Sequence, residues 1–333
     1  MDKEKFKALV IRQVDKKAAC AFEDLTVEGL PQGDVLVKVD YSSLNYKDAM
    51  ALTGTGKIVR EYPMVPGIDL AGTVMESASS AYKPGDEVVL TGWSVGERYW
   101  GGYTQVARVR SEWLVPLPEG LDTKKAMAIG TAGFTGMLCV LTLEGAGITP
   151  DKGKILVTGA SGGVGSVAVS VLANLGYSVA ALTPVGQEGS HDYLKSLGAK
   201  EIISGPEWSA PPRPLETQIW AGAVDTVGTI VLARVLAQMD YGGCVANCGL
   251  AGGVDLPTTV MPFILRGVSL RGVDSVMCPI EKRKIAWKRL VKDLPANALE
   301  AIHHTVPLSQ VMDCAKKMMS GEIRGRMVVD VNG

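Results

Sequence analysis

A glycine-rich stretch between a strand pattern and a helix pattern constrains the fold of this chain more than any other feature. It reads KILVTGASGGVGSVAVSVLANL and runs from Lys154 to Leu175. Ile155–Val157 is the short apolar run of a buried strand, and the apolar residues after the glycines recur with the spacing of one helix face. Strand, glycine turn and helix form the first half of a dinucleotide-binding βαβ unit, in which a pyrophosphate rests on free N–H groups at the start of the helix. The stretch therefore predicts a nucleotide site.

The glycines are spaced G-x-x-G-x-x-G, at Gly159, Gly162 and Gly165, instead of the commoner G-x-G-x-x-G. A tight turn that uses glycine only for packing is the alternative. It fits less well, because four glycines within seven residues cost conformational entropy that such a turn does not require.

Composition places the chain among ordinary enzymes of two domains. It has 333 residues, 47% of them hydrophobic and 21% charged, and a net charge of −1. The distribution of Lys and Arg does not indicate nucleic-acid binding. The apolar residues between 164 and 182 are interrupted by Asn174 and Gly176, so we expect no membrane span. The first residues, MDKEKFKALV, lack the apolar core of a secretory signal, and we expect a cytoplasmic protein.

The cysteines and histidines favour neither a disulfide framework nor a metal site. Six cysteines are present and none forms a C-x-x-C pair, and the three histidines show no spacing for zinc. We therefore predict no metal ligand set.

The pattern of elements predicts an α/β fold with two kinds of domain. Residues 1–122 read as successive strands with turns and predict a small barrel-like domain. Residues 123–266 alternate strands and helices and predict a doubly wound parallel sheet. Residues 267–333 are too short for a third domain, so we expect them to return to the first. Their basic segment EKRKIAWKR reads as the solvated face of a helix that turns Ile285, Leu290, Val291 and Leu294 inward.

The tip of the second strand of the nucleotide domain bears on the choice of cofactor. An NAD site places Asp or Glu there, but this tip reads Thr183-Pro184-Val185-Gly186. The missing negative charge favours NADP, although no arginine replaces the acid.

Longer motifs carry a family resemblance. The first set resembles the quinone-oxidoreductase branch of the medium-chain dehydrogenase/reductase superfamily: SSLNYKD (42–48), PGIDLAGTV (66–74), GDEVVLTGW (85–93), TAGFTGMLCV (131–140) and TGASGGVGS (158–166). A second set is similar to the NADPH-dependent acryloyl-CoA reductases of bacteria: LTGWSVGERYWGGY (90–103), YLKSLGA (193–199), QMDYGGCVANCGLAGG (238–253) and LPTTVMPFILRGVSLRGVDSVM (256–277).

This resemblance implies a GroES-like catalytic domain in two sequence segments, a Rossmann domain between them, and NADPH-dependent reduction of acryloyl-CoA to propanoyl-CoA. Zinc alcohol dehydrogenases of the superfamily carry G-H-E where this chain has Gly67-Ile68-Asp69, a cysteine near the position of Asn45, and a four-cysteine lobe. All three are missing here, so the resemblance implies a reaction without a Lewis-acid metal.

The resemblance also implies cofactor contacts residue by residue. Tyr46 is expected near the nicotinamide, Thr183 at the 2′-phosphate, and Ser161, Gly162, Gly163 and Val164 at the pyrophosphate. Leu250, Ile264 and Arg326 are expected to complete the cleft. Relatives carry S-G-R at the second strand tip, where this chain has Thr183-Pro184-Val185 and a longer loop.

The expected reaction is conjugate reduction, in which hydride attacks the β-carbon and the enolate takes a proton at the α-carbon. The candidates are Asn45 for substrate orientation and Tyr46 for the proton or its relay. Alternatively, Tyr46 only packs against the nicotinamide and water supplies the proton. Asp48 and Asp69 read as structural groups, and Asp225 as a ribose contact or a turn residue.

The loop Gly92–Gly102 has two interpretations. Its Trp93, Arg98, Tyr99 and Trp100 suit adenine stacking and phosphate pairing of a CoA chain, or they anchor a surface loop.

Two further functions stay open at this stage: a quinone or other enone reductase, and a nucleotide-binding protein without turnover. The resemblance implies a homodimer in which a strand near Val268–Val273 extends the sheet across a two-fold axis.

Overall fold

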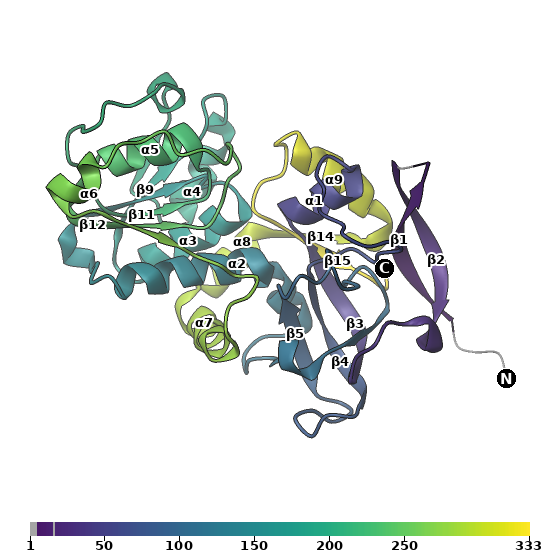
Figure 1. Cartoon of the computed structure of the whole chain (residues 1–333). Coiled ribbons are helices and arrows are strands. Elements are labelled where there is room, and N and C mark those ends of the chain that lie inside the picture. Colours follow the sequence, from purple (N-terminus) through teal and green to yellow (C-terminus); the bar gives the residue numbers. More distant parts are fainter. Residues whose placement is uncertain (1–4, 16) are drawn as a thin grey trace. The chain divides into compact units, whose positions relative to one another are not determined.

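The computed structural model describes residues 5–15 and 17–333 and divides into two compact units (Figure 1). Unit 1 comprises Met1–Thr131, Val276–Val291 and His303–Gly333. Unit 2 comprises Ala132–Ser275 and Lys292–Ile302. The chain thus leaves unit 1 twice, first to form the body of unit 2 and again for residues 292–302, and returns to unit 1 each time.

Unit 2 contains a six-stranded sheet in the order β10-β9-β8-β11-β12-β13, with every neighbouring pair parallel. In chain order this is 3-2-1-4-5-6, the arrangement of a doubly wound dinucleotide-binding sheet. The prediction of such a sheet is confirmed. Its strands are β8 (Lys154–Thr158), β9 (Ser178–Leu182), β10 (Glu201–Ile203), β11 (Trp220–Asp225), β12 (Met239–Asn247) and β13 (Ser269–Gly272).

Helices cover this sheet because their apolar residues need a partner surface. α3 (Gly163–Asn174) packs on β8 and β9, and α5 (Thr229–Ala237) packs on β11 and β12 (Figure 1). Leu232, Val235 and Leu236 of α5 are buried together with the strand residues beneath them. The remaining helices of unit 2 are α4 (His191–Ser196), α6 (Met261–Arg266) and α8 (Ala296–Ile302).

Unit 1 contains a seven-stranded, mainly antiparallel sheet. Its order is β14-β15-β3-β4-β5-β7, and β6 also pairs with β3. The strands are β3 (Val35–Leu44), β4 (Asp69–Ser77), β5 (Glu87–Thr91), β6 (Val106–Val109), β7 (Val115–Pro116), β14 (His303–Pro307) and β15 (Arg326–Asp330). A separate hairpin is formed by β1 (Lys5–Val14) and β2 (Lys17–Thr26).

Three helices belong mainly to unit 1. α1 (Tyr46–Thr53) packs on α9 (Val311–Met319), and α7 is Ile280–Asp293. Short 3-10 turns occur at Val27–Gly29, Ser111–Trp113, Pro150–Lys152, Glu188–Ser190, Pro206–Ser209 and Leu308–Gln310.

α2 (Thr123–Glu144) consists of two helical parts that meet at a kink. At the kink, Gly130 has the non-helical angles φ 50° and ψ −163°. By length and composition it is apolar enough to cross a membrane, but 83% of its most apolar window is buried within the protein. A core helix passes the same test.

The two units differ from the predicted domain boundaries in three places. Residues 123–131 belong to unit 1, since Thr131 bonds Asp69 there. Residues 267–275 belong to unit 2 because β13 pairs with β12. Residues 292–302 also belong to unit 2, where the Asn174 amide donates to the Asp293 carbonyl at 3.0 Å.

The inward face predicted for the basic helix is partly wrong. Leu290 and Leu294 are buried, but Ile285 and Val291 are exposed. Arg283, Ala286 and Trp287 occupy the buried face instead.

Candidate functional site

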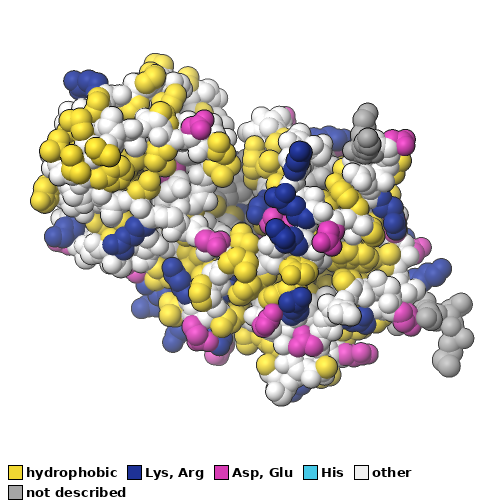
Figure 2. All heavy atoms as spheres, viewed as in Figure 1, with side chains coloured by type: hydrophobic (Ala, Val, Ile, Leu, Met, Phe, Trp, Pro, Cys, Tyr) yellow, Lys and Arg dark blue, Asp and Glu magenta, His cyan; other side chains and the backbone are white. Residues whose placement is uncertain are grey.

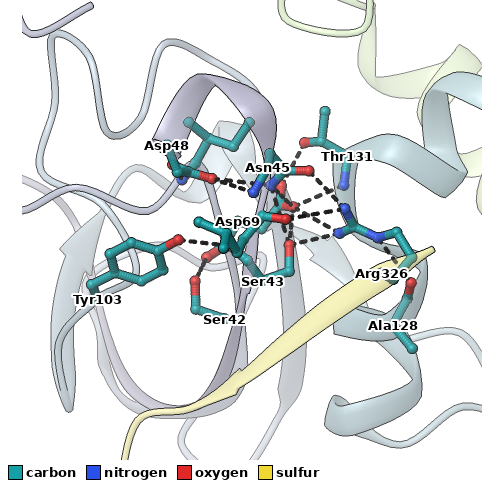
Figure 3. A network of polar contacts seen from close by, with 11 residues as sticks. Ser42, Ser43, Asn45, Asp48, Asp69, Tyr103, Ala128, Thr131 and Arg326 are labelled. Atoms are coloured by element: carbon teal, nitrogen blue, oxygen red, sulfur yellow. Dashed lines mark hydrogen bonds and ion pairs between the residues drawn. The ribbon is translucent and has the colours of Figure 1, made fainter. Parts of the chain in front are cut away.

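A buried carboxylate, Asp69, lies at the centre of a polar network in unit 1 (Figure 3). Its Oδ2 accepts hydrogen bonds from Ser43 Oγ at 2.5 Å, Asn45 Nδ2 at 2.8 Å and the Thr131 backbone N–H at 2.9 Å. Its Oδ1 accepts from the Thr131 hydroxyl. A carboxylate buried this completely is tolerable only with such a set of donors.

Arg326 supplies the opposite charge from β15. Its side chain is buried, and its Nη2 lies 3.8 Å from Asp69 Oδ2. Nη1 donates to Asn45 Oδ1 at 3.0 Å, Nη2 to Ser43 Oγ at 2.8 Å, and Nε to the Ala128 carbonyl at 3.2 Å. Burial lowers the pKa of the guanidinium, and the charge of Asp69 opposes that shift only in part.

The break in α2 follows from this network. A Cβ on Gly130 would overlap Arg326 Nη2 and would lie 2.7 Å from Asp69 Oδ2 and 2.9 Å from Ser43 Oγ. Only glycine fits, because its φ of 50° is also unfavourable for other residues.

Asp48 links the network to the start of α1. It accepts hydrogen bonds from the backbone N–H groups of Asn45 and Ile68, each at 2.9 Å, and so caps the helix. Burial, and secondarily the charge of Asp69, raises the pKa of Asp48 to about 7. Nearby, burial raises the pKa of Tyr103 well above its usual value, and its hydroxyl donates to the Ser43 carbonyl at 3.1 Å.

Asn45 and Tyr46 are adjacent in sequence but differ in environment. Asn45 is buried, and both ends of its amide have partners within unit 1. Tyr46 is the first residue of α1 and is 48% exposed. Among the described residues none is bonded to its hydroxyl, so Tyr46 presents a phenol to solvent beside the buried network.

The glycine turn of unit 2 runs from β8 into α3, as predicted. Gly159 has φ 57°, and a Cβ there would overlap Thr226 Oγ1. A Cβ on Gly165 would overlap the Gly159 carbonyl. These two glycines are therefore required by packing within the chain, in contrast to Gly162, whose nearest neighbour would be 3.3 Å away. Gly162 is the N-cap of α3 and provides no side-chain bond to the helix N–H groups.

Thr183 lies at the same edge of the sheet as this turn. β8 and β9 are parallel, and the Ala160 N–H donates to the Leu182 carbonyl at 3.2 Å. The Thr183 hydroxyl is buried and has no hydrogen-bond partner among the described residues. Ser161 at the turn donates to Gln187 of the following loop at 3.2 Å. An unpaired buried hydroxyl beside a helix N-terminus fits a ligand that brings its own acceptor.

The other residues of unit 2 that were predicted for the site differ in their surroundings. Asp225 is buried and accepts from Thr158, Asn247 and the Gly228 N–H, which is the turn role. Leu250 lines a cavity of about 640 Å³. Ile264 is 71% exposed on α6 and does not line that cavity.

Sequence reasoning missed part of the network in unit 1. Ser43, Tyr103, Gly130 and Thr131 are separated from Asp69 by up to 62 positions, and no spacing connects them. Among the described residues, no group of three or more His, Cys, Asp or Glu side chains is placed to hold a metal ion.

Comparison with known proteins agrees with this architecture. Residues 31–119 match the model of the alcohol dehydrogenase GroES-like domain, and residues 163–292 match that of the zinc-binding dehydrogenases. The two units and their glycine turn define a medium-chain dehydrogenase/reductase, and the predicted α/β fold with a GroES-like domain is confirmed.

Individual relatives are similar over nearly the whole chain. The probable acrylyl-CoA reductase AcuI of Escherichia coli is 57% identical, with 98% of this chain and 99% of the relative covered. The acrylyl-CoA reductase AcuI of Ruegeria pomeroyi is 55% identical over the same shares. A crystal structure of E. coli YhdH with bound NADPH superposes with a TM-score of 0.95 at 57% identity, covering 98% of this chain and all of that one. The chain belongs to the AcuI family of acrylyl-CoA reductases.

Proposed function

We propose that the protein reduces the activated double bond of acryloyl-CoA to propanoyl-CoA with NADPH. The observation that carries this proposal is the 55–57% identity to acrylyl-CoA reductases over 98% of the chain. The two polar sites described above provide the parts that such a reaction needs.

The residues of unit 2 fit a dinucleotide. Ser161, Gly162, Gly163 and Val164 would hold the pyrophosphate on the N–H groups that begin α3. Thr183, whose buried hydroxyl lacks a partner among the described residues, would bond the 2′-phosphate. The absence of an arginine at this tip leaves Thr183 and backbone N–H groups to recognise that phosphate. When bound, NADPH supplies the hydride that the β-carbon accepts.

After hydride addition the thioester substrate needs a proton at its α-carbon, because the added electron pair would otherwise remain on the enolate. Tyr46 is the phenol that unit 1 exposes at the start of α1. We assign proton delivery to its hydroxyl.

Asn45 and Arg326 have hydrogen-bond partners of their own within unit 1. Their polar groups bond Asp69, Ser43 and each other. The expected contact of Arg326 with the cofactor stays a prediction that these bonds do not favour, because a substrate or cofactor would have to displace them. We propose that both residues position Tyr46 by fixing the N-terminus of α1.

We also propose that the protein is a homodimer. β13 is the last strand of its sheet, so among the described residues its outer edge has no partner strand. An apolar patch, visible in Figure 2 as yellow surface on unit 2, lies in the segment that precedes this strand. Its exposed members are Leu250, Val254, Val260, Ile264 and Leu265. A second copy pairing edge to edge would bury both features.

Since CoA thioesters and NADPH are retained inside cells by their charge, we propose a cytoplasmic location.

The test is the loss of NADPH absorbance with purified protein and three acceptors: acryloyl-CoA, crotonoyl-CoA and a simple quinone. We expect acryloyl-CoA to be reduced fastest, and NADPH to be preferred over NADH. Faster reduction of the quinone would overturn the choice of substrate. Tight binding of NADPH without oxidation by any acceptor would indicate a nucleotide-binding protein without turnover.

A further inference from the structure

A second cavity in unit 1 combines guanidinium groups with aromatic rings. Its volume is about 380 Å³, and it is lined by segments 31–32, 61–64 and 98–100 and by residues 108, 110 and 113. Three arginines line it: Arg98, Arg108 and Arg110. The size lies within the range of small-molecule sites.

The cavity carries an excess of positive charge. Glu61 is the one carboxylate among its lining residues, against three guanidinium groups, of which that of Arg110 pairs with Glu112 at 3.7 Å. The Arg98 side chain is exposed, and no described residue forms a hydrogen bond or ion pair with its guanidinium. Arg108 makes only a long bond, 3.4 Å, to the Leu30 carbonyl. Guanidinium groups with unused donors bind phosphate in bidentate geometry.

Aromatic rings form another part of the lining. Tyr99 packs against Trp113 with ring centroids 4.8 Å apart, and Arg110 lies about 5 Å from both rings. Trp100 is held by a hydrogen bond from its Nε1 to the Pro63 carbonyl at 2.9 Å. Tyr99 remains 39% exposed, so part of its ring is free to stack on a planar base.

The wall of the cavity is fixed to the helix that carries Tyr46. Lys47, the next residue, pairs with Glu97 at 2.8 Å, and the Glu97 carbonyl accepts from the Arg60 N–H at 2.9 Å. Arg98 and Tyr99 follow Glu97 directly. The cavity is thus preorganised on the same unit as the exposed phenol.

We propose that this cavity binds the phosphorylated adenosine end of the CoA thioester substrate. Arg98, together with Arg108, pairs with the phosphates, and the adenine stacks on Tyr99. The proposal rests on the proposed function, since it assigns a subsite to that substrate. A free adenine nucleotide shares this chemistry, and the experiment separates the two sources.

The experiment compares acryloyl-CoA with acryloyl-pantetheine, which has the same thioester but no nucleotide. Arg98→Gln is expected to raise KM for acryloyl-CoA about tenfold, the loss of one charge-assisted bond, with kcat unchanged. KM for acryloyl-pantetheine is expected to stay as in the wild type. Arg213→Gln, which removes an exposed arginine of unit 2, is the matched control and is expected to change neither. An equal rise of KM for both thioesters, or no rise, overturns the proposal.

A titration with adenosine 3′,5′-bisphosphate, on protein saturated with NADP⁺ and followed by tryptophan fluorescence, tests the cavity directly. We expect binding that Arg98→Gln weakens about tenfold. Equal affinity of the wild type and Arg98→Gln for this nucleotide overturns the proposal. If binding depends on Arg98 but KM for acryloyl-CoA is unchanged in the variant, the cavity binds a free nucleotide, and this result overturns the proposal as well. If neither thioester is reduced, the proposed function fails, while the titration still decides whether the cavity binds this nucleotide through Arg98.

Discussion

Asn45 and Tyr46 show how far two neighbouring residues can differ in role. The extended backbone at Asn45 turns its side chain into the network of Asp69, whereas the first helical residue, Tyr46, is half exposed. The sequence indicates both residues as candidates for the site. Orientation of the substrate by Asn45 stays a prediction, and in the structure its amide bonds Asp69 and Arg326.

Tyr46→Phe tests proton delivery. We expect kcat for acryloyl-CoA to fall about 100-fold, because the phenol proton is lost while the ring remains. KM and the free energy of unfolding are expected to change little, since the hydroxyl has no described partner. Tyr241→Phe, at a highly exposed tyrosine of unit 2, is the control. An unchanged kcat in Tyr46→Phe would show that water supplies the proton.

Asp48 predicts a dependence of stability on pH. The pKa of Asp48 in the folded protein is about 7, whereas the ordinary pKa of a free aspartate is 3.8. Between these values the folded state binds more protons than the unfolded state, so the free energy of unfolding falls as pH rises through the window.

Asp48→Asn removes this contribution. We expect the variant to lose less stability than the wild type between about pH 5 and about pH 8 in urea unfolding, because an amide does not titrate. Parallel losses in the two proteins would mean that Asp48 is already ionised at the lower pH.

At the level of elements, α2 is a helix whose regular backbone is interrupted by a contact with a distant part of the chain. The apolar residues from Thr123 onward indicate one helix near Thr123–Leu143, and α2 has nearly the same ends. The break at Gly130 could not be predicted, since it exists to admit Arg326 from a strand almost 200 positions later.

Gly130→Ala is expected to destabilise the protein by about 3 kcal/mol, measured by urea unfolding. The cost combines a positive φ with the overlap of Cβ and the Arg326 guanidinium. Gly54→Ala provides the comparison, because Gly54 has φ 70° but open space around its Cβ. We expect it to cost about 1 kcal/mol, the strain alone. Equal costs at the two sites would contradict the steric argument.

The buried face predicted for α7 is partly wrong, because a charged residue in a helix pattern usually indicates an exposed position. Arg283 is buried: its guanidinium donates to the Thr91 and Val276 carbonyls at 2.7 and 2.8 Å and lies 4.7 Å from the Trp93 ring. These acceptors come from other segments, so the helix sequence carries no signal for them.

For the whole molecule, the proposed dimer makes a separate prediction. Val260→Asp places a charge in the apolar patch, and we expect it to shift the protein from dimer to monomer in sedimentation velocity. Val14→Asp, at an exposed valine of β1 in unit 1, is expected to leave the dimer intact. A wild-type protein that sediments as a monomer, or a Val260→Asp dimer, would contradict the proposal.

The nucleotide-binding unit was determined largely by the sequence. Its signals are local: an apolar strand, a glycine turn and a helix period lie within 22 consecutive residues, and alternation then continues along the chain. Hydrophobic periodicity and turn chemistry act between near neighbours, so they can be recognised without coordinates.

Only the tertiary structure decided the polar centre of unit 1 and the limits of the units. Asp69 accepts hydrogen bonds from β3, Asn45 and α2 and pairs with a charge from β15, and Arg326 bonds Asn45 across 281 positions. β13 joins unit 2 because its backbone pairs with β12. A buried charge needs several precisely oriented donors, and these come from wherever the chain returns, whereas a helix or strand needs only its own residues.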